Sequence, residues 1–195
     1  MIKFTFLKSS LSFVNLTIAS IVSGWIDRID DKVNIRNEFT RELYLPHKFK
    51  LLLRGSRDGF TPKKFHELCN NVSCTVTFIK VKGTEEILGG YNPLMWKSSG
   101  GWTQSKNSFI FSFKNNNNFK DQILSHVDNI QQAIYFHPRR GPSFTTDLFI
   151  SSRINSRNYH TCYCKLTNYK KEIRDTSANF SIEDYEVFQI LKNEI

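Results

Sequence analysis

Histidine and cysteine are the residues of this chain that are best suited to act as bases, nucleophiles or metal ligands. Four histidines are candidate general bases: His66, His126, His137 and His160. The chain contains no G-x-S-x-G nucleophile elbow, no H-E-x-x-H zinc motif and no G-x-x-x-x-G-K phosphate loop. Spacing alone therefore defines no catalytic site, and we expect no enzymatic activity. An enzyme with an unrecognised active site is the alternative.

The four cysteines form two pairs. Cys69 and Cys74 are spaced C-x4-C, and Cys162 and Cys164 are spaced C-x-C. Zinc sites commonly use C-x2-C pairs and small secreted folds use dense disulfide frameworks, so we expect free thiols with no metal and no cofactor. Cys69 lies on the inward face of a predicted helix, where burial would make it inert. Cys162 and Cys164 would share one strand face, so redox sensing through a partly exposed pair stays open.

The chain is basic, with 27 Lys and Arg against 18 Asp and Glu, a net charge of +9. Such a balance favours nucleic acid, an anionic membrane or an acidic protein when the charge is clustered. Here the basic residues occur as scattered pairs, and no run reaches three. We therefore expect a solvated surface and no nucleic-acid partner, with a basic nucleic-acid-binding domain as a weaker alternative.

Two charged segments are candidate protein-binding sites. Arg54, Arg57 and Asp58 belong to a short loop bounded by glycines, where Asp58 could instead accept backbone amides and pair with an arginine. Glu183 and Asp184 precede the last predicted strand of an otherwise basic protein. They could contact a basic partner, or they could simply solvate a strand edge.

Glycine and tryptophan give further candidates. Gly89 and Gly90 permit close backbone approach or a bulge, and Trp96 and Trp102 could anchor either the core or a partner. An exposed tryptophan would mark an interface, and a buried one would not. We include Gly89, Gly90 and Trp96 among the expected protein-binding residues.

The elements that position these residues begin with an N-terminal helix. Apolar residues at steps of three and four between Leu11 and Ile29 predict an amphipathic α-helix. Polar residues interrupt this stretch, so it is neither a secretory signal nor the run of ~20 apolar residues that spans a bilayer. The helix could dock on this protein's own sheet or on a partner. A polar linker through Arg41 follows, so we expect an N-terminal segment at 1–40 and one domain at 41–195.

The remainder of the chain is predicted to be mainly β. Thr61 and Pro62 are placed to start a short helix, and the glycine at 83 lies in the turn of an expected hairpin. We expect strands at 50–54, 72–81, 86–91, 108–113, 133–136, 147–150 and 185–190. The segment 121–127 is ambiguous between a helix and a strand. Pro138, Gly141 and Pro142 separate the strand at 133–136 from the strand at 147–150. The fold class is mainly β (α+β): a two-sheet antiparallel β-sandwich flanked by short helices.

Several of these segments occur in an order that resembles a known family. The segments are Leu52-Leu53-Arg54-Gly55-Ser56-Arg57-Asp58-Gly59-Phe60, Lys64-Phe65-His66-Glu67-Leu68-Cys69, Ile87-Leu88-Gly89-Gly90-Tyr91, Trp96, Ser108-Phe109-Ile110-Phe111-Ser112, Gly141-Pro142-Ser143-Phe144 and Phe180-Ser181-Ile182-Glu183-Asp184-Tyr185-Glu186-Val187-Phe188. Taken together they resemble the TLDc family, particularly fungal members in which this domain often follows a BTB domain. The residues before Leu43 are too few for a BTB domain, so we expect a free-standing TLDc form or a misplaced start codon.

The resemblance covers about Leu43 to Ile190 and implies a β-sandwich in which 121–127 is a strand. Family members are associated with protection against oxidative damage and, in several cases, with binding the vacuolar proton-pumping ATPase, without an agreed enzymatic activity. The resemblance therefore implies a non-catalytic protein-interaction module whose partners include subunits of that pump. We expect the protein to be a cytoplasmic monomer with no transmembrane segment.

Overall fold

The computed structural model describes residues 12–28, 46–115, 121–152 and 159–192, except for the side chains of 152 and 159–161. The expected linker at 30–41, the side chain of His160 and most of the asparagine run at 115–118 lie outside the described residues. The chain forms two compact units, one made of 1–50 with 190–195 and the other of 51–189. No helix within the described ranges is long and apolar enough to cross a membrane.

The predicted N-terminal helix is present as α2, Leu16–Ile26. Its first turn is fixed by Asn15, whose extended backbone ends the preceding segment and whose side-chain oxygen accepts the amide of Ile18 at 2.9 Å. This cap explains why the helix starts at Leu16. All residues from Ile18 to Trp25 are buried, so burial extends beyond the predicted apolar face.

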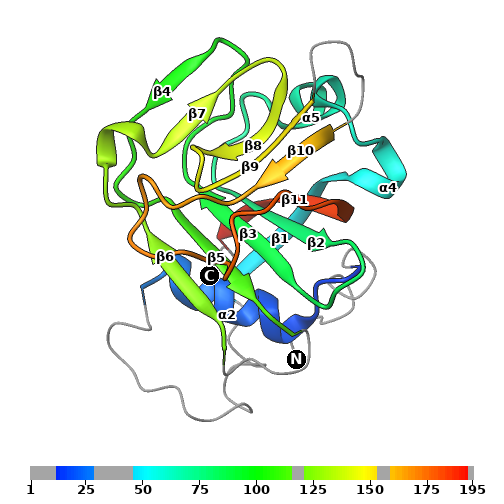
Figure 1. Cartoon of the computed structure of the whole chain (residues 1–195), viewed down its shortest axis with the longest axis vertical. Coiled ribbons are helices and arrows are strands. Elements are labelled where there is room, and N and C mark those ends of the chain that lie inside the picture. Colours follow the sequence, from blue (N-terminus) through cyan, green and yellow to red (C-terminus); the bar gives the residue numbers. More distant parts are fainter. Residues whose placement is uncertain (1–11, 29–45, 116–120, 153–158, 193–195) are drawn as a thin grey trace. The chain divides into compact units, whose positions relative to one another are not determined.

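The main sheet has six strands in the order β1-β11-β2-β3-β5-β6 (Figure 1). Its strands are β1 His47–Arg54, β2 Thr75–Val81, β3 Ile87–Asn92, β5 Phe109–Phe113, β6 Ile123–His126 and β11 Ile182–Lys192. The expected hairpin is confirmed, because Lys80 pairs with Ile87 across the β2–β3 turn. The ambiguous segment is also settled: β6 is a strand, paired antiparallel to β5.

The second layer consists of two small sheets, β10-β9-β8 and β4-β7 (Figure 1). Their bounds are β4 Gly101–Thr103, β7 Ile134–Phe136, β8 Arg140–Phe144, β9 Leu148–Ser152 and β10 Tyr159–Tyr163, with a short 3-10 turn, η1, at Ile130–Gln132. The predicted break at Gly141 and Pro142 is wrong, because both residues lie inside β8. The register shifts between Arg140 and Ser143, and such an irregularity accommodates a proline without a ladder donor.

One hydrophobic core joins the two layers and confirms the predicted sandwich. It draws Leu53, Leu88 and Val187 from the main sheet and Phe136 and Ile150 from the second layer. Because apolar side chains of both layers leave water together, this shared core is the main favourable contribution to the fold of residues 51–189.

Two short helices follow β1. α4, Gly55–Asp58, is a single helical turn where the sequence indicated a short loop bounded by glycines. α5, Pro62–Cys69, is confirmed as predicted: the Thr61 hydroxyl accepts the Lys64 amide at 3.1 Å, and Pro62 occupies the first turn. Its inward residues Phe65 and Cys69 are fully buried.

Candidate functional site

The fold brings two charged segments together that are far apart in the sequence. The segment 54–58 ends β1 and forms α4, and the segment 184–186 belongs to the start of β11 (Figure 1). We call their charged and polar side chains the charged corner; its members are Arg54, Ser56, Arg57, Asp58, Asp184 and Glu186.

Asp184 provides the N-terminal cap of α4 from the other segment. Its Oδ1 accepts the backbone amide of Ser56 at 2.9 Å, and its Oδ2 accepts the Ser56 hydroxyl at 2.6 Å. The same Oδ1 accepts the amide of Tyr185 at 2.8 Å. A carboxylate at a helix N-terminus satisfies amides that have no partner inside the helix. Ser56 was not singled out from the sequence, since its partner lies 128 residues away and no local pattern links the two.

Gly55 permits this close approach. A Cβ at this position would lie 2.5 Å from the Phe60 ring, 2.8 Å from the Tyr185 ring and 2.9 Å from Asp184 Oδ1. These distances are too short for any side chain, so glycine is required by space and not by backbone conformation. The backbone of α4 at Gly55 therefore packs directly against the side chains of Asp184 and Tyr185 on β11.

Asp58 closes the turn from within, as one of the two interpretations of the sequence proposed. Its Oδ2 accepts the Arg54 amide at 2.9 Å, and Arg57 binds both carboxylate oxygens, with Nε–Oδ1 at 2.9 Å and Nη2–Oδ2 at 2.7 Å. The hydrogen bond from Arg57, followed by the amide of Arg54, holds the pKa of Asp58 below its ordinary value although burial opposes this. The same hydrogen bond raises the pKa of Arg57.

Arg54 makes the buried ion pair of the charged corner. Its Nε lies 2.6 Å from Oε1 of Glu186, whose side chain is 0% exposed. A buried carboxylate is strongly unfavourable without a cation or donors beside it, so the Arg54 guanidinium offsets part of the cost of burying Glu186. Arg57, in contrast, is 51% exposed, and it is the arginine of the corner that a partner can reach.

The other predicted binding residues occupy two different environments. Glu183 is exposed next to the charged corner. Gly89, Gly90 and Trp96 are buried, and a Cβ on Gly90 would meet the Phe144 ring at 2.6 Å. Trp96 is 1% exposed and donates from its indole nitrogen to the Thr75 hydroxyl at 2.7 Å. These three residues shape the core and are not available at the described surface.

The cysteines are free, and three of them are buried. The expectation that Cys162 and Cys164 are partly exposed is wrong, because both side chains lie in the core. Burial raises the pKa of Cys162 to about 12 and raises that of Cys164 and Cys69 further. Since the thiolate is the reactive form, these thiols are poor nucleophiles at neutral pH. Cys74 is the one with intermediate exposure.

His66 also makes contacts that link elements of the fold. Its Nδ1 lies 2.9 Å from Oδ1 of Asn70, and its Nε2 lies 3.1 Å from the backbone oxygen of His137. These contacts tie α5 to the turn after β7. They engage both ring nitrogens, so His66 is positioned as a link between elements and not as a free base.

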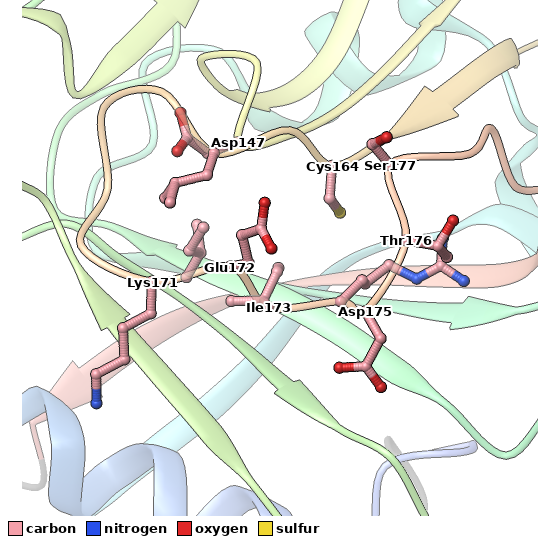
Figure 2. A pocket seen from close by; sticks show the side chains of 11 residues that line it. Asp147, Cys164, Lys171, Glu172, Ile173, Asp175, Thr176 and Ser177 are labelled. Atoms are coloured by element: carbon pink, nitrogen blue, oxygen red, sulfur yellow. The ribbon is translucent and has the colours of Figure 1, made fainter.

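A polar pocket of about 190 Å³ lies between the β10–β11 connection and the core (Figure 2). It is lined by Ile110, Asp147, Cys164, Leu166 and residues 171–177. Figure 2 shows the Lys171 ammonium and the Asp175 carboxylate pointing away from the hollow, while the Cys164 sulfur points towards it. No histidine is among the lining residues, and the acid–base groups that line the pocket with the thiol are the carboxylates of Asp147, Glu172 and Asp175 and the Lys171 ammonium.

Asp147 organises one wall of the pocket. Its carboxylate accepts the backbone amides of Thr167, Asn168 and Tyr169 at 2.8 to 3.1 Å, and it also accepts the Thr145 hydroxyl. A buried carboxylate that receives several backbone amides fixes the loop that supplies them. This role was not predicted, because the acceptor and the loop lie about twenty residues apart and belong to no known motif.

Metal binding has no support in the described part of the chain, where no group of three His, Cys, Asp or Glu residues could hold an ion. Comparison with family models gives a match to the TLDc domain over residues 30–191, which includes the charged corner and the pocket. The match starts earlier than the boundary at residue 41 that the sequence suggested. No curated protein matches the chain.

Proposed function

Because the chain belongs to the TLDc family, we propose that it is a non-catalytic protein-interaction module acting in oxidative-stress protection or in regulation of the vacuolar proton-pumping ATPase. The module acts from the cytoplasm as a monomer. The observation that carries the proposal is the charged corner, where a fixed backbone presents charged side chains to solvent. Its exposed arginine, Arg57, and the neighbouring exposed Glu183 are the residues that contact a partner.

The rigidity of the corner supports binding. Asp184 and Asp58 accept the backbone amides of Ser56 and Arg54 at the start of α4, and the Arg54–Glu186 pair anchors the turn to β11. A surface that is already ordered loses little conformational entropy when a partner docks, so more of the contact energy remains as affinity. Charged residues around such a site steer and select partners.

The environment of the thiols supports a protective role without chemistry by the chain itself. A thiol that reduces peroxide must ionise readily, and burial raises the pKa of Cys69, Cys162 and Cys164. The polar pocket beside Cys164 contains no histidine, and Asp147 is engaged by backbone amides. Protection against oxidants would therefore come from what the module binds.

The test is co-purification of the vacuolar ATPase with the tagged chain from cell extracts, followed by binding of the purified peripheral sector of the pump. The charge-reversed variant Arg57→Glu with Glu183→Lys is compared with Lys63→Glu with Glu67→Lys, two reversals on exposed positions of α5. We expect pump subunits with the wild-type chain and the α5 variant, and a loss of at least about tenfold in binding with the corner variant.

Peroxide survival of cells with and without the chain is measured in parallel. Retained protection by the corner variant together with retained binding would remove the corner from the proposal. An absence of pump subunits, of any other reproducible protein partner and of an effect on survival would overturn the proposed function itself.

A further inference from the structure

The second layer has an aromatic surface that is separate from the charged corner. Trp102 on β4 lies opposite Tyr135 on β7, and their ring centroids are 4.7 Å apart. His137 stacks on Tyr135, with centroids 6.0 Å apart and planes inclined by 18°. Trp102 is 48% exposed, whereas Trp25 and Trp96 are buried. By the criterion set from the sequence, Trp102 is therefore the tryptophan that marks an interface.

Arg140, at the start of β8, is held on this surface by two rings. Its Cζ lies 4.8 Å from the centre of the Tyr135 ring and 4.5 Å from the centre of the Phe149 ring. Aromatic faces hold the flat side of a guanidinium and leave its N–H edges for hydrogen bonding. Among the described residues, no hydrogen bond or ion pair involves the Arg140 side chain, unlike those of Arg54, Arg57 and Arg174.

The surroundings of Arg140 are cationic. The pKa of His137 is lowered first by burial and then by Arg140, Arg139 and His66. In the sequence, the stretch 87–171 contains eleven Lys and Arg against three Asp and Glu, a difference of +8 within a total of +9. One of these three acids, Asp147, is buried and engaged by backbone amides. This excess belongs to the sequence between residues 87 and 171, and the arginines that act on His137 at this surface are Arg140 and Arg139.

We propose that the aromatic–arginine face, made of Trp102, Tyr135, His137, Arg139 and Arg140, docks an acidic segment of a partner protein. A carboxylate of that segment pairs with the Arg140 guanidinium through two parallel N–H···O bonds, and a neighbouring apolar side chain covers Trp102. This inference rests on the proposed function, because it assigns a chemistry to a partner. It adds a second surface, with its own recognition rule, to the charged corner.

Charge complementarity selects the acidic occupant. Tyr135 already has Trp102, His137 and Arg140 against its ring, so it has little open face on which a nucleotide base could stack. Single-stranded nucleic acid also needs a basic groove that follows several phosphates, whereas the cations fixed here gather at the turn between β7 and β8. A pre-positioned planar fork beside one exposed indole fits a carboxylate with an apolar neighbour better.

The experiment measures binding of short fluorescent peptides to the full-length chain by anisotropy. The probes are a ten-residue peptide of Glu and Asp around one Leu, the same peptide with Ser in place of Leu, a Lys-rich peptide around one Leu, and a thymidine oligonucleotide. Acrylamide quenching of tryptophan fluorescence is recorded with and without the acidic Leu peptide. Trp102 is the exposed tryptophan, so docking should protect it from the quencher.

The variants are Arg140→Gln, which keeps length but removes the charge, and Trp102→Ala, with Lys82→Gln at the β2–β3 turn as the charge-matched control. Loss of a charged hydrogen-bonding pair should weaken the acidic peptide about tenfold or more in Arg140→Gln, and Lys82→Gln should bind as the wild type does. Trp102→Ala should weaken the Leu peptide but not the Ser peptide. Far-ultraviolet circular dichroism confirms that each variant is folded.

Several results would overturn the proposal: no binding of the acidic Leu peptide, equal binding of the Lys-rich peptide, no effect of Arg140→Gln, or no protection of Trp102 from acrylamide. Tighter binding of the oligonucleotide with the same sensitivity to Arg140→Gln would also overturn it, in favour of nucleic acid. The proposed function is tested separately, because a chain that fails all peptide assays but still co-purifies its partner through the charged corner retains that function.

Discussion

The charged corner and the aromatic–arginine face use arginine in opposite ways. In the corner, Arg54 lies 2.6 Å from a fully buried carboxylate and Arg57 binds both oxygens of Asp58. On the face, two aromatic rings hold Arg140, and no described carboxylate pairs with it. A buried pair such as Arg54 with Glu186 stabilises the fold, whereas an arginine fixed by rings and left without an acid is prepared for an external one. Stability measurements should therefore separate the two regions.

The largest expected effect comes from removing the buried pair in the corner. Arg54→Ala leaves the carboxylate of Glu186 buried without its cation, and should lower the free energy of unfolding by about 3 kcal/mol. Arg140→Ala loses only ring contacts and should cost about 1 kcal/mol or less. Urea unfolding followed by circular dichroism measures both.

Equal costs for Arg54→Ala and Arg140→Ala would contradict this comparison. The double replacement of Arg54 by Met and of Glu186 by Leu gives an independent check, since it removes both charges and leaves none uncompensated. It should cost less than Arg54→Ala alone. A double variant that is less stable than the single variant would show that the corner depends on the charges themselves.

The second effect concerns glycine, which the two regions need for different reasons. Gly55→Ala places a Cβ 2.5 Å from the Phe60 ring and should cost about 2 kcal/mol through overpacking. Gly101, next to Trp102, has open space for a Cβ but a φ of +114°, so Gly101→Ala should cost about 1 kcal/mol through backbone strain. Thermal unfolding of the two variants measures which substitution costs more stability. Trimming Phe60 to Leu should reduce the cost at Gly55 and leave that at Gly101 unchanged.

The third effect is a pH dependence in the corner. The hydrogen bond from Arg57 holds the pKa of Asp58 low, so the carboxylate contributes stability above about pH 4, and this is lost as pH falls through the folded-state pKa. Because Arg57 is half-exposed, we expect less than about 1 kcal/mol. Stability curves of the wild type and Arg57→Gln should converge in acid. Curves that stay parallel down to pH 2 would contradict the assignment.

The sequence predicts the elements of this fold well because their signals are local. Thr61 and Pro62 mark the start of α5 within two residues, and a stretch rich in β-branched residues marks β2. The proline inside β8 was misinterpreted as a separator, because whether a strand tolerates proline depends on a register irregularity with its neighbour. That irregularity has no local signature.

The two sites were harder to predict because they depend on distant pairs. Arg57 and Asp184 were both selected as candidates, but only the fold shows that Asp184 caps the turn holding Arg57. The aromatic–arginine face was not predicted, because Tyr135 and Arg140 are brought together only when β4, β7 and β8 assemble in the fold. A search for runs of basic residues also missed the excess of Lys and Arg over Asp and Glu, because this excess is spread over residues 87–171.

The smallest effect tests whether the charge of Arg140 on the aromatic–arginine face is left without a compensating carboxylate. Burial, and then Arg140, Arg139 and His66, lower the pKa of His137, which faces these cations with Tyr135 stacked on it. Arg140→Gln should raise this pKa in an NMR titration, although burial will keep it below about 6.5. An unchanged pKa would mean that Arg140 exerts no field at the face.

The sign of this effect distinguishes the two regions. In the corner, an arginine lowers the pKa of an acid by stabilising its charged form; on the face, burial and then the arginines lower the pKa of His137 by opposing its charged form. The unfolded chain therefore takes up this proton first, and the stability contributed by His137 is present above about pH 6.5 and lost below it. An acidic peptide docked on Arg140 should reverse the shift and raise the pKa of His137. A pKa that stays constant while the peptide binds would place the peptide elsewhere.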